Sequence, residues 1–249
     1  DMVLKSAYYV SNLFKRLTMP DQLTFDLPIK TAFGREDFFV TSSNSTAVKI
    51  LENWKNWPLS KLILIGPSGS GKSHLANIWT EMTNGVRIEA KYLMDIDLQV
   101  ASQSALCLEG FEVIAGNQEL EAHAFHLHNL AQESGAPLLI TGCSTPSTWN
   151  LLLPDLLSRI QGTSVAQLQS PDDVLLNAVL IKQFNDRQIA IDPKVVTYLL
   201  KRMERSFASI SYLVNELDKG ALKVGKPISI KLARNVLDSF FKDAPLDYV

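Results

Sequence analysis

The stretch that most constrains this chain is Gly66-Pro67-Ser68-Gly69-Ser70-Gly71-Lys72-Ser73, followed by His74. It lies between the apolar run 62–65 and an expected helix, so it has the spacing and context of a phosphate-binding loop. Glycines allow backbone N–H groups to curl around a phosphate, and the N-terminus of the following helix attracts the anion. We therefore expect Lys72 to reach the outer phosphates of a nucleotide, and the Ser73 hydroxyl to bind Mg²⁺.

Apolar runs alternate with helical patterns over the first two thirds of the chain, which predicts a parallel α/β sheet flanked by helices. The expected strands are 62–65, 86–90, 105–109, 137–142 and 165–168. The expected helices of this part are 46–54, 74–83, 120–133 and 154–160. After residue 170 only amphipathic helices are expected, at 172–185, 193–202, 206–223 and 230–241. We therefore expect an N-terminal extension (1–35), a nucleotide-binding α/β domain (36–169) and a small all-helical C-terminal domain (170–249).

The charge and the cysteine content exclude several classes of protein. The net charge is −2 and the pI is about 6.1, which argues against a surface that binds DNA phosphates directly. Apolar runs stay short of the ~18 residues that a membrane span needs. Two cysteines, Cys107 and Cys143, fit a reducing compartment, so we expect a cytoplasmic protein in which both are small buried apolar residues.

The segment between Pro20 and Pro28 is expected to be extended, because proline disfavours helix on either side. It holds a glutamine and spaced apolar side chains, namely Gln22, Leu23, Phe25 and Leu27. Such a peptide either docks into a groove on a partner or forms an edge strand on its own domain. The residue pattern alone favours neither alternative.

A phosphate-loop domain followed by a helical lid resembles the AAA+ ATPases. Residues 37–47, with Asp37-Phe38-Phe39-Val40 and Ser43-Asn44, resemble the segment of the initiator DnaA that wraps adenine. The runs 106–116, 139–142 and 153–159 are similar to Hda, the DnaA-related family of regulators that inactivate DnaA. The resemblance covers about residues 36–240. It implies that Phe39, Val40 and Asn44 lie near adenine, and that residues 22–27 form a peptide that binds the replication sliding clamp.

The resemblance also indicates which of the groups that the family uses for ATP hydrolysis are present. Two carboxylates are expected after the third strand, where this chain has Glu109 and Gly110. Glu109 can approach Mg²⁺ through water, but glycine cannot activate a water molecule. The polar sensor of the fourth strand aligns with Cys143, and the lid sensor arginine aligns with Ala208, while Arg205 is expected to point elsewhere. We therefore expect nucleotide binding, with ADP or ATP, and weak intrinsic hydrolysis.

Arg159 aligns with the arginine finger of the family, which reaches the nucleotide of a neighbouring subunit and accelerates hydrolysis there by about 10³ to 10⁵. The alternative is a surface arginine that pairs with Asp155 on the same helix. Three histidines, His123, His126 and His128, share one expected helix, but they lack the further ligand of a metal site, so we expect them to be solvated or half-buried.

Taken with the resemblance, these features predict a regulator of bacterial replication initiation. It would dock on the DNA-loaded sliding clamp and present Arg159 to ATP held by DnaA, with DNA contact only indirect or weak. A second copy of the chain is a further candidate partner. Two rival functions remain open at this point: a self-sufficient AAA+ ATPase of the helicase-loader type, and a clamp-bound adaptor whose nucleotide is purely structural.

Overall fold

The computed structural model describes residues 30–32 and 35–243, with side chains described from residue 38 to residue 241. The predicted clamp-binding peptide, residues 22–27, lies outside the described residues.

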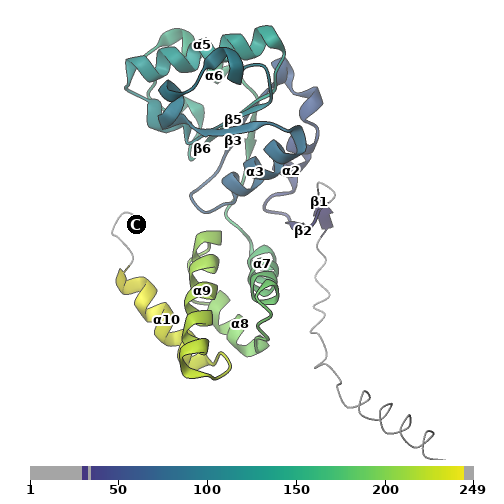
Figure 1. Ribbon diagram of the computed structural model, residues 1–249, viewed down its shortest axis with the longest axis vertical. Coiled ribbons are helices and arrows are strands. Elements are labelled where there is room, and N and C mark those ends of the chain that lie inside the picture. The colour runs from purple at the N-terminus through teal and green to yellow at the C-terminus, as the bar shows by residue number, and fades with distance from the viewer. Residues whose placement is uncertain (1–29, 33–34, 244–249) are drawn as a thin grey trace, which may run out of the picture.

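A five-stranded parallel sheet forms the centre of the first domain (Figure 1). Its strand order is β4-β5-β6-β3-β7, and every neighbouring pair is parallel. The strands are β3 (Lys61–Ile65), β4 (Val86–Glu89), β5 (Leu106–Glu109), β6 (Leu138–Gly142) and β7 (Val165–Gln167). All five expected strands are present, and the predicted α/β class is confirmed.

Helices cover both faces of the sheet (Figure 1). One face carries α2 (Ser45–Glu52) and α3 (Lys72–Thr83), and the other carries α5 (Gln118–Ser134) and α6 (Pro154–Gln161), with the short α4 (Leu98–Ala101) against α5. Successive residues of β3 point to opposite faces, as a strand requires. Ile63 accordingly packs in the core under α5 and α6, whereas Leu62 and Leu64 pack in the core under α2 and α3.

An antiparallel strand pair precedes the sheet and was not expected. It consists of β1 (Lys30–Ala32) and β2 (Arg35–Val40). Short 3-10 turns complete the loops, at Trp54–Asn56, Pro58–Ser60, Ala90–Asp95, Phe111–Ile114 and Pro146–Thr148.

Four helices form the second, C-terminal domain: α7 (Asp173–Asp186), α8 (Pro193–Leu200), α9 (Phe207–Val224) and α10 (Ile230–Asp243). Three of them begin at a side-chain cap, in which Asp172, Asp192 or Ser206 accepts a backbone N–H of the first turn. The domain has its own apolar core, centred on Leu180, Phe184 and Leu213.

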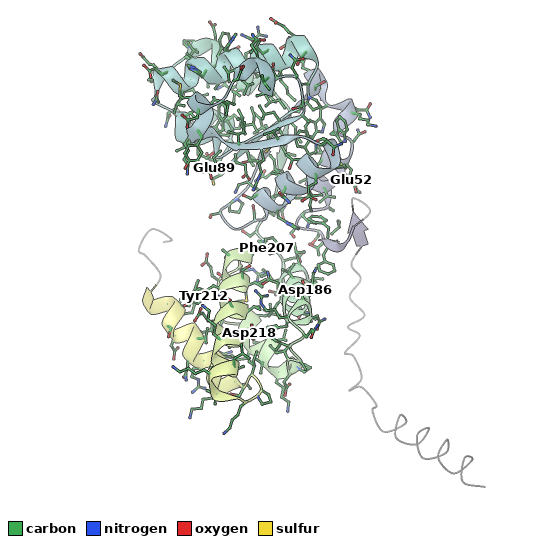
Figure 2. The ribbon with its side chains drawn as sticks, in the orientation of Figure 1. Glu52, Glu89, Asp186, Phe207, Tyr212 and Asp218 are labelled. Carbon is green, nitrogen blue, oxygen red and sulfur yellow. The ribbon has the colours of Figure 1, made fainter. Side chains whose placement is uncertain are left out.

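The helical domain lies beside the phosphate loop. Figure 2 shows Phe207 at the end of α9 that faces the α/β domain. The backbone N–H of Phe207 donates to the carbonyl of Gly69 at 3.3 Å. The two domains therefore meet at the loop that the sequence predicts to hold phosphate.

Candidate nucleotide-binding site

The phosphate loop joins the buried strand β3 to helix α3, which begins at Lys72. Gly69 and Gly71 adopt positive φ angles of 71° and 95°, a region that glycine occupies at little cost. Gly71 precedes α3 and supplies no side-chain cap, so the first N–H groups of the helix stay available to an anion. The Ser70 hydroxyl is buried and has no partner among the described residues. The loop thus has the geometry of an anion cradle.

A cleft of about 990 Å³ extends from this loop to the lid helices. Its volume is at the upper end of the range for small-molecule sites. The cleft is lined by residues of β2, the phosphate loop, the ends of β4, β5 and β6, and helices α7 and α9, including Phe39, Asn44, Ser68, Gly69, Ser70, Gly71, Lys72, Ser73, His74 and Glu109. The structure therefore brings most of the sequence-predicted nucleotide-binding residues to one cavity, while Val40 packs against the core beneath it.

Lys72 folds back onto its own loop. Its Nζ atom donates to the carbonyl oxygens of Gly66 at 2.7 Å and Pro67 at 2.9 Å. An ammonium group held by two carbonyls can exchange one of them for a phosphate oxygen, a stronger, charged acceptor. Lys72 is thus placed at the cradle before any ligand binds.

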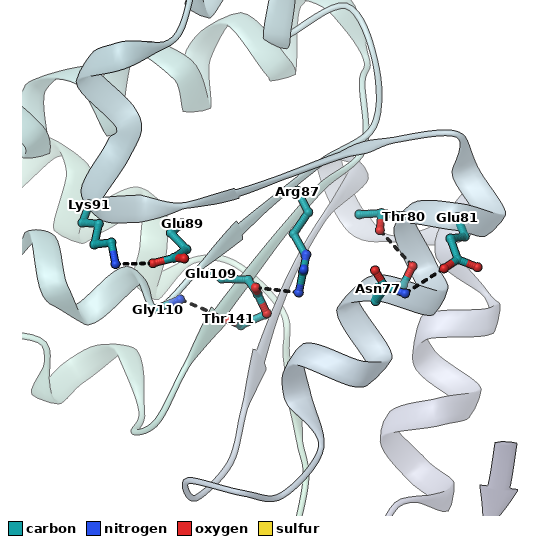
Figure 3. A network of polar contacts seen from close by, with 9 residues as sticks. All are labelled: Asn77, Thr80, Glu81, Arg87, Glu89, Lys91, Glu109, Gly110 and Thr141. Carbon is teal, nitrogen blue, oxygen red and sulfur yellow. Dashed lines mark hydrogen bonds and ion pairs between the residues drawn. The ribbon is translucent and has the colours of Figure 1, made fainter. Parts of the chain in front are cut away.

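Glu109, at the end of β5, is bound by an arginine of the neighbouring strand (Figure 3). The Nη1 atom of Arg87 lies 3.0 Å from Glu109 Oε2, while Glu109 Oε1 is buried and without a partner among the described residues. Mg²⁺ retains several waters and takes few protein ligands, so an orphan carboxylate oxygen that lines the same cleft as Ser73 fits its requirements. Ser73 and Glu109 would hold the ion, which would neutralise phosphate charge when bound.

Gly110 turns the chain away from the strand. Its φ is +65°, and its N–H donates to Thr141 Oγ1 at 3.2 Å. Two residues later the chain brings a second carboxylate to the cleft, because Glu112 Oε1 accepts the backbone N–H of Cys143 at 3.0 Å. The other oxygen, Glu112 Oε2, is buried and unpartnered among the described residues. Glu112 is a site residue that sequence reasoning missed, because its position depends on this turn.

Cys143 lines the cleft and is exposed, so the expectation that it is a buried apolar residue is wrong, whereas Cys107 is buried as predicted. Desolvation of the thiol, followed by its hydrogen bond to Glu112, raises the pKa of Cys143. The thiol therefore stays neutral at pH 7 and offers the cleft only a weak hydrogen-bond donor.

The lid contacts the phosphate loop through Phe207, not through Ala208. Phe207 lines the cleft, whereas Ala208 is exposed and lies one residue further along α9, where the helix turns its side chain away. Ala208 therefore does not line the cleft, and its alignment with the lid sensor stays a prediction from the resemblance. Arg205 does point elsewhere, as expected: it pairs with Asp173 at 2.7 Å and donates to the carbonyl of Pro171.

The end of the cleft where the resemblance places adenine is built from β2 and the loop after it. Asn44 donates from Nδ2 to the Phe39 carbonyl at 3.0 Å and accepts the Thr41 N–H at 2.9 Å. Asn44 thus fixes the conformation of the loop after β2. The ring of His74 stacks on that of Phe38, with the two ring centroids 5.6 Å apart. Helix α7 contributes Gln183, which the sequence had not singled out and whose Oε1 atom is buried without a partner among the described residues.

Arg159 lies outside this cleft, on α6, and its side chain is exposed. Among the described residues its guanidinium group makes no hydrogen bond or ion pair, so the alternative, a pair with Asp155, is not formed. Within the same part of the chain no group of three or more His, Cys, Asp or Glu could hold a metal. His128 is buried, so the expectation that it is solvated or half-buried is wrong, and its Nδ1 atom accepts from Lys61 Nζ at 3.1 Å.

The structure has relatives of known fold. Domain III of the replication initiation protein DnaA from Thermotoga maritima superposes with a TM-score of 0.74 at 18% identity, covering 86% of this chain and 99% of that one. AMPPCP-bound DnaA from Aquifex aeolicus gives 0.62 at 14% identity, over 75% and 65% of the two chains. A Thermotoga maritima RuvB mutant gives 0.62 at 17% identity, over 81% and 70%.

The fold is therefore that of DnaA domain III and of RuvB, with a phosphate-loop α/β domain followed by a helical lid. Residues 173–237 match the family model described as "Hda, lid domain". The lid is thus similar to the lid domain of the Hda family, and the chain as a whole shares the fold of DnaA domain III. Across residues 30–32 and 35–243, no helix is long and apolar enough to cross a membrane.

Proposed function

We propose that this protein regulates replication initiation by stimulating hydrolysis of ATP bound to the initiator DnaA. The Hda-type lid and the DnaA-like fold support a DnaA-related replication regulator. The finer mechanism has three parts: an adenine nucleotide bound in the cleft, a clamp-binding peptide at residues 22–27, and an arginine finger at Arg159.

The observation that carries the proposal is the contrast between Arg159 and the nucleotide cleft of the chain itself. Arg159 presents an exposed guanidinium group with no partner among the described residues. The home cleft, in contrast, has glycine at position 110, a cysteine thiol at 143 and the apolar ring of Phe207 where the lid meets the phosphate loop. Within the described part of the chain, an unpaired, exposed arginine together with a cleft that lacks groups suited to ATP hydrolysis fits a protein that acts on ATP held by another subunit.

The cleft supports nucleotide binding in this mechanism. Its phosphate loop, Lys72 and the open N-terminus of α3 suit the phosphates of ADP or ATP, and one of the similar structures is AMPPCP-bound DnaA. Bound nucleotide would contact both the α/β domain and the lid, because residues of both line the cleft. It would thereby fix the angle between them, and Mg²⁺ would be held by Ser73 and, through water, by Glu109.

The experiment measures hydrolysis of DnaA-bound ATP in the presence of clamp loaded on DNA. Wild type is compared with Arg159→Ala, and Arg234→Ala, an exposed arginine on the lid helix α10, is the matched control. We expect wild type and the control to accelerate hydrolysis, and Arg159→Ala to lose most of the stimulation, by about 10³-fold. If Arg159→Ala stimulates as wild type does, the finger is refuted.

A further variant tests the predicted clamp-binding peptide, residues 22–27. Replacing Gln22 and Phe25 by alanine should weaken clamp binding and leave nucleotide affinity unchanged. If wild type binds the clamp and yet never accelerates hydrolysis, the adaptor function replaces the regulator. Hydrolysis by the isolated chain at rates of about 1 s⁻¹ or more, within the usual enzyme range, would instead favour a self-sufficient ATPase.

A further inference from the structure

Helix α5 carries a fully buried carboxylate, Glu121, whose side chain is 0% exposed. Its oxygens accept three backbone N–H groups: Oε1 accepts from Gly116 at 2.8 Å, and Oε2 accepts from Leu152 at 2.8 Å and Leu153 at 2.7 Å. A buried carboxylate is tolerated when hydrogen bonds replace its hydration, and bonds to a charged acceptor are stronger than neutral ones. Glu121 is therefore held firmly and holds its partners firmly.

Two of these partners lie directly before the helix that carries Arg159. Leu153 is the residue that precedes α6, and it offers no side-chain cap of its own. Figure 1 shows α5 and α6 on the same face of the sheet, and the two helices are in contact. Glu121 thus binds the chain at the point where it turns into α6, six residues before Arg159.

The apolar contacts of α6 do not fix its position alone. Leu156 and Ile160 are buried in the core beneath the helix. Apolar contacts set how deeply a helix packs, but they are non-directional. Directional hydrogen bonds at Leu152 and Leu153 add what the core lacks, a fixed rotation and translation of the first turn.

We propose that Glu121 is the positioning residue that fixes α6 and thereby sets the place of the Arg159 guanidinium group. The role of that group as a finger rests on the function proposed above. The third bond, to Gly116, ties the same carboxylate to the segment that leaves β5 and the nucleotide cleft. The position of α6 is thereby tied to the nucleotide cleft of this chain as well as to α5.

The test uses Glu121→Gln in the full chain, with Glu119→Gln as control. Glu119 lies on the same helix, is exposed, and its side chain binds no backbone N–H among the described residues. The glutamine amide keeps the size of the side chain but cannot accept with its nitrogen, so it loses part of the three-way bond. Nucleotide affinity and the melting temperature show whether each variant is folded.

Two readouts decide the matter. Hydrogen exchange at the amides of residues 152–161 should become about tenfold faster or more in Glu121→Gln and stay unchanged in Glu119→Gln. The maximal stimulation of hydrolysis of DnaA-bound ATP should fall about 10- to 100-fold, since misplacement by about 1 Å can cost 10²-fold. The protein concentration that gives half of the maximal effect should stay within twofold of wild type.

A double variant separates positioning from general damage. If Glu121 acts through Arg159, Glu121→Gln combined with Arg159→Ala is no less active than Arg159→Ala alone. Wild-type exchange at residues 152–161 in Glu121→Gln would overturn the inference. If Arg159→Ala itself stimulates normally, the proposed function fails, while the exchange measurement still decides whether Glu121 fixes α6. Should Glu121→Gln not fold, Glu121→Asp, with the charge kept and the reach shortened, replaces it under the same criteria.

Discussion

The ring of Phe207, in the lid, lies against Gly71, in the phosphate loop: a Cβ atom built on Gly71 would stand 2.8 Å from Phe207 Cε2. The neighbouring Gly69 has the same relation to Ser206, whose Cβ would lie 2.4 Å from an added Cβ atom. The lid is therefore seated on a loop that has no side chains at the points of contact. Several consequences of this seating and of the cleft beside it can be measured.

Substitution of Gly71 by alanine should weaken nucleotide binding at least tenfold. The new methyl group would displace Phe207 and strain a backbone with a φ of +95°. Gly135→Ala is the matched control, because its φ is +72° and nothing lies within 4 Å of the added atom. That variant should cost only about 1 kcal/mol of stability and leave the dissociation constant for fluorescent ADP unchanged.

A second substitution isolates the contact with the lid. Phe207→Ala introduced into Gly71→Ala should recover part of the lost affinity, because the clash is then removed and only the backbone strain remains. ADP binding by Gly71→Ala that equals wild type would contradict the seating of the lid.

Replacing Phe207 by arginine should make the cleft discriminate between ATP and ADP. A guanidinium group beside the phosphate loop would add a charge-assisted hydrogen bond, so binding of ATP should tighten about tenfold relative to ADP. Ala208→Arg, exposed and outside the cleft, should leave the ratio of the two dissociation constants unchanged. The opposite result would identify Ala208, and not Phe207, as the position that faces the nucleotide.

The contact between Arg87 and Glu109 should limit the contribution of Mg²⁺. Arg87→Ala frees both carboxylate oxygens, so the gain in nucleotide affinity between EDTA and Mg²⁺ should rise about two- to fivefold, which corresponds to a partly exposed ion pair. Glu109→Gln should reduce the same gain. Lys91→Ala, which breaks the nearby pair with Glu89, is the control. An unchanged gain in Glu109→Gln would show that Glu109 is not near the ion.

His128 should make the protein sensitive to acid. Burial, together with the positive charges of Lys61 and Arg159, lowers the pKa of His128 from 6.5 to about 4. The unfolded chain therefore binds a proton that the native chain excludes between about pH 6.5 and pH 4, so this group makes stability fall as pH falls through that window.

The matched variant is His128→Asn, whose Oδ1 atom can accept from Lys61 in place of Nδ1. Urea unfolding at pH 7 and pH 4.5 should show a loss of stability about 2 kcal/mol larger in wild type than in the variant. Equal losses in the two proteins would mean that His128 titrates normally in the native state.

The sheet and the phosphate loop could be predicted because their signals are local. The run 62–65 is bounded by turn residues and followed at once by the complete loop motif, so strand, loop and helix are all encoded within a dozen residues. The strand pair β1–β2 escaped prediction because Arg35, Glu36 and Asp37 interrupt any alternating pattern. The helix expected at 46–54 ends at Glu52, and a 3-10 turn follows at Trp54–Asn56.

The remaining site residues depend on distances that a linear pattern does not contain. Phe207 and Ala208 are adjacent on α9, and only the packing of this helix on the phosphate loop decides which of the two lines the cleft. Glu112 reaches the cleft through the left-handed turn at Gly110. Glu121 has partners that are backbone amides 31 and 32 residues away, which carry no signature in the sequence.

The glycines of the phosphate loop also limit how far the sequences of the two domains can change independently of each other. Gly69 and Gly71 serve a ligand on one side and Ser206 and Phe207 on the other. A larger residue at either glycine has to be accommodated by both surfaces, even where nucleotide binding alone would tolerate it. A lid transplanted from a related protein would therefore have to match this loop, and the interchangeable unit is the loop together with the first turn of α9.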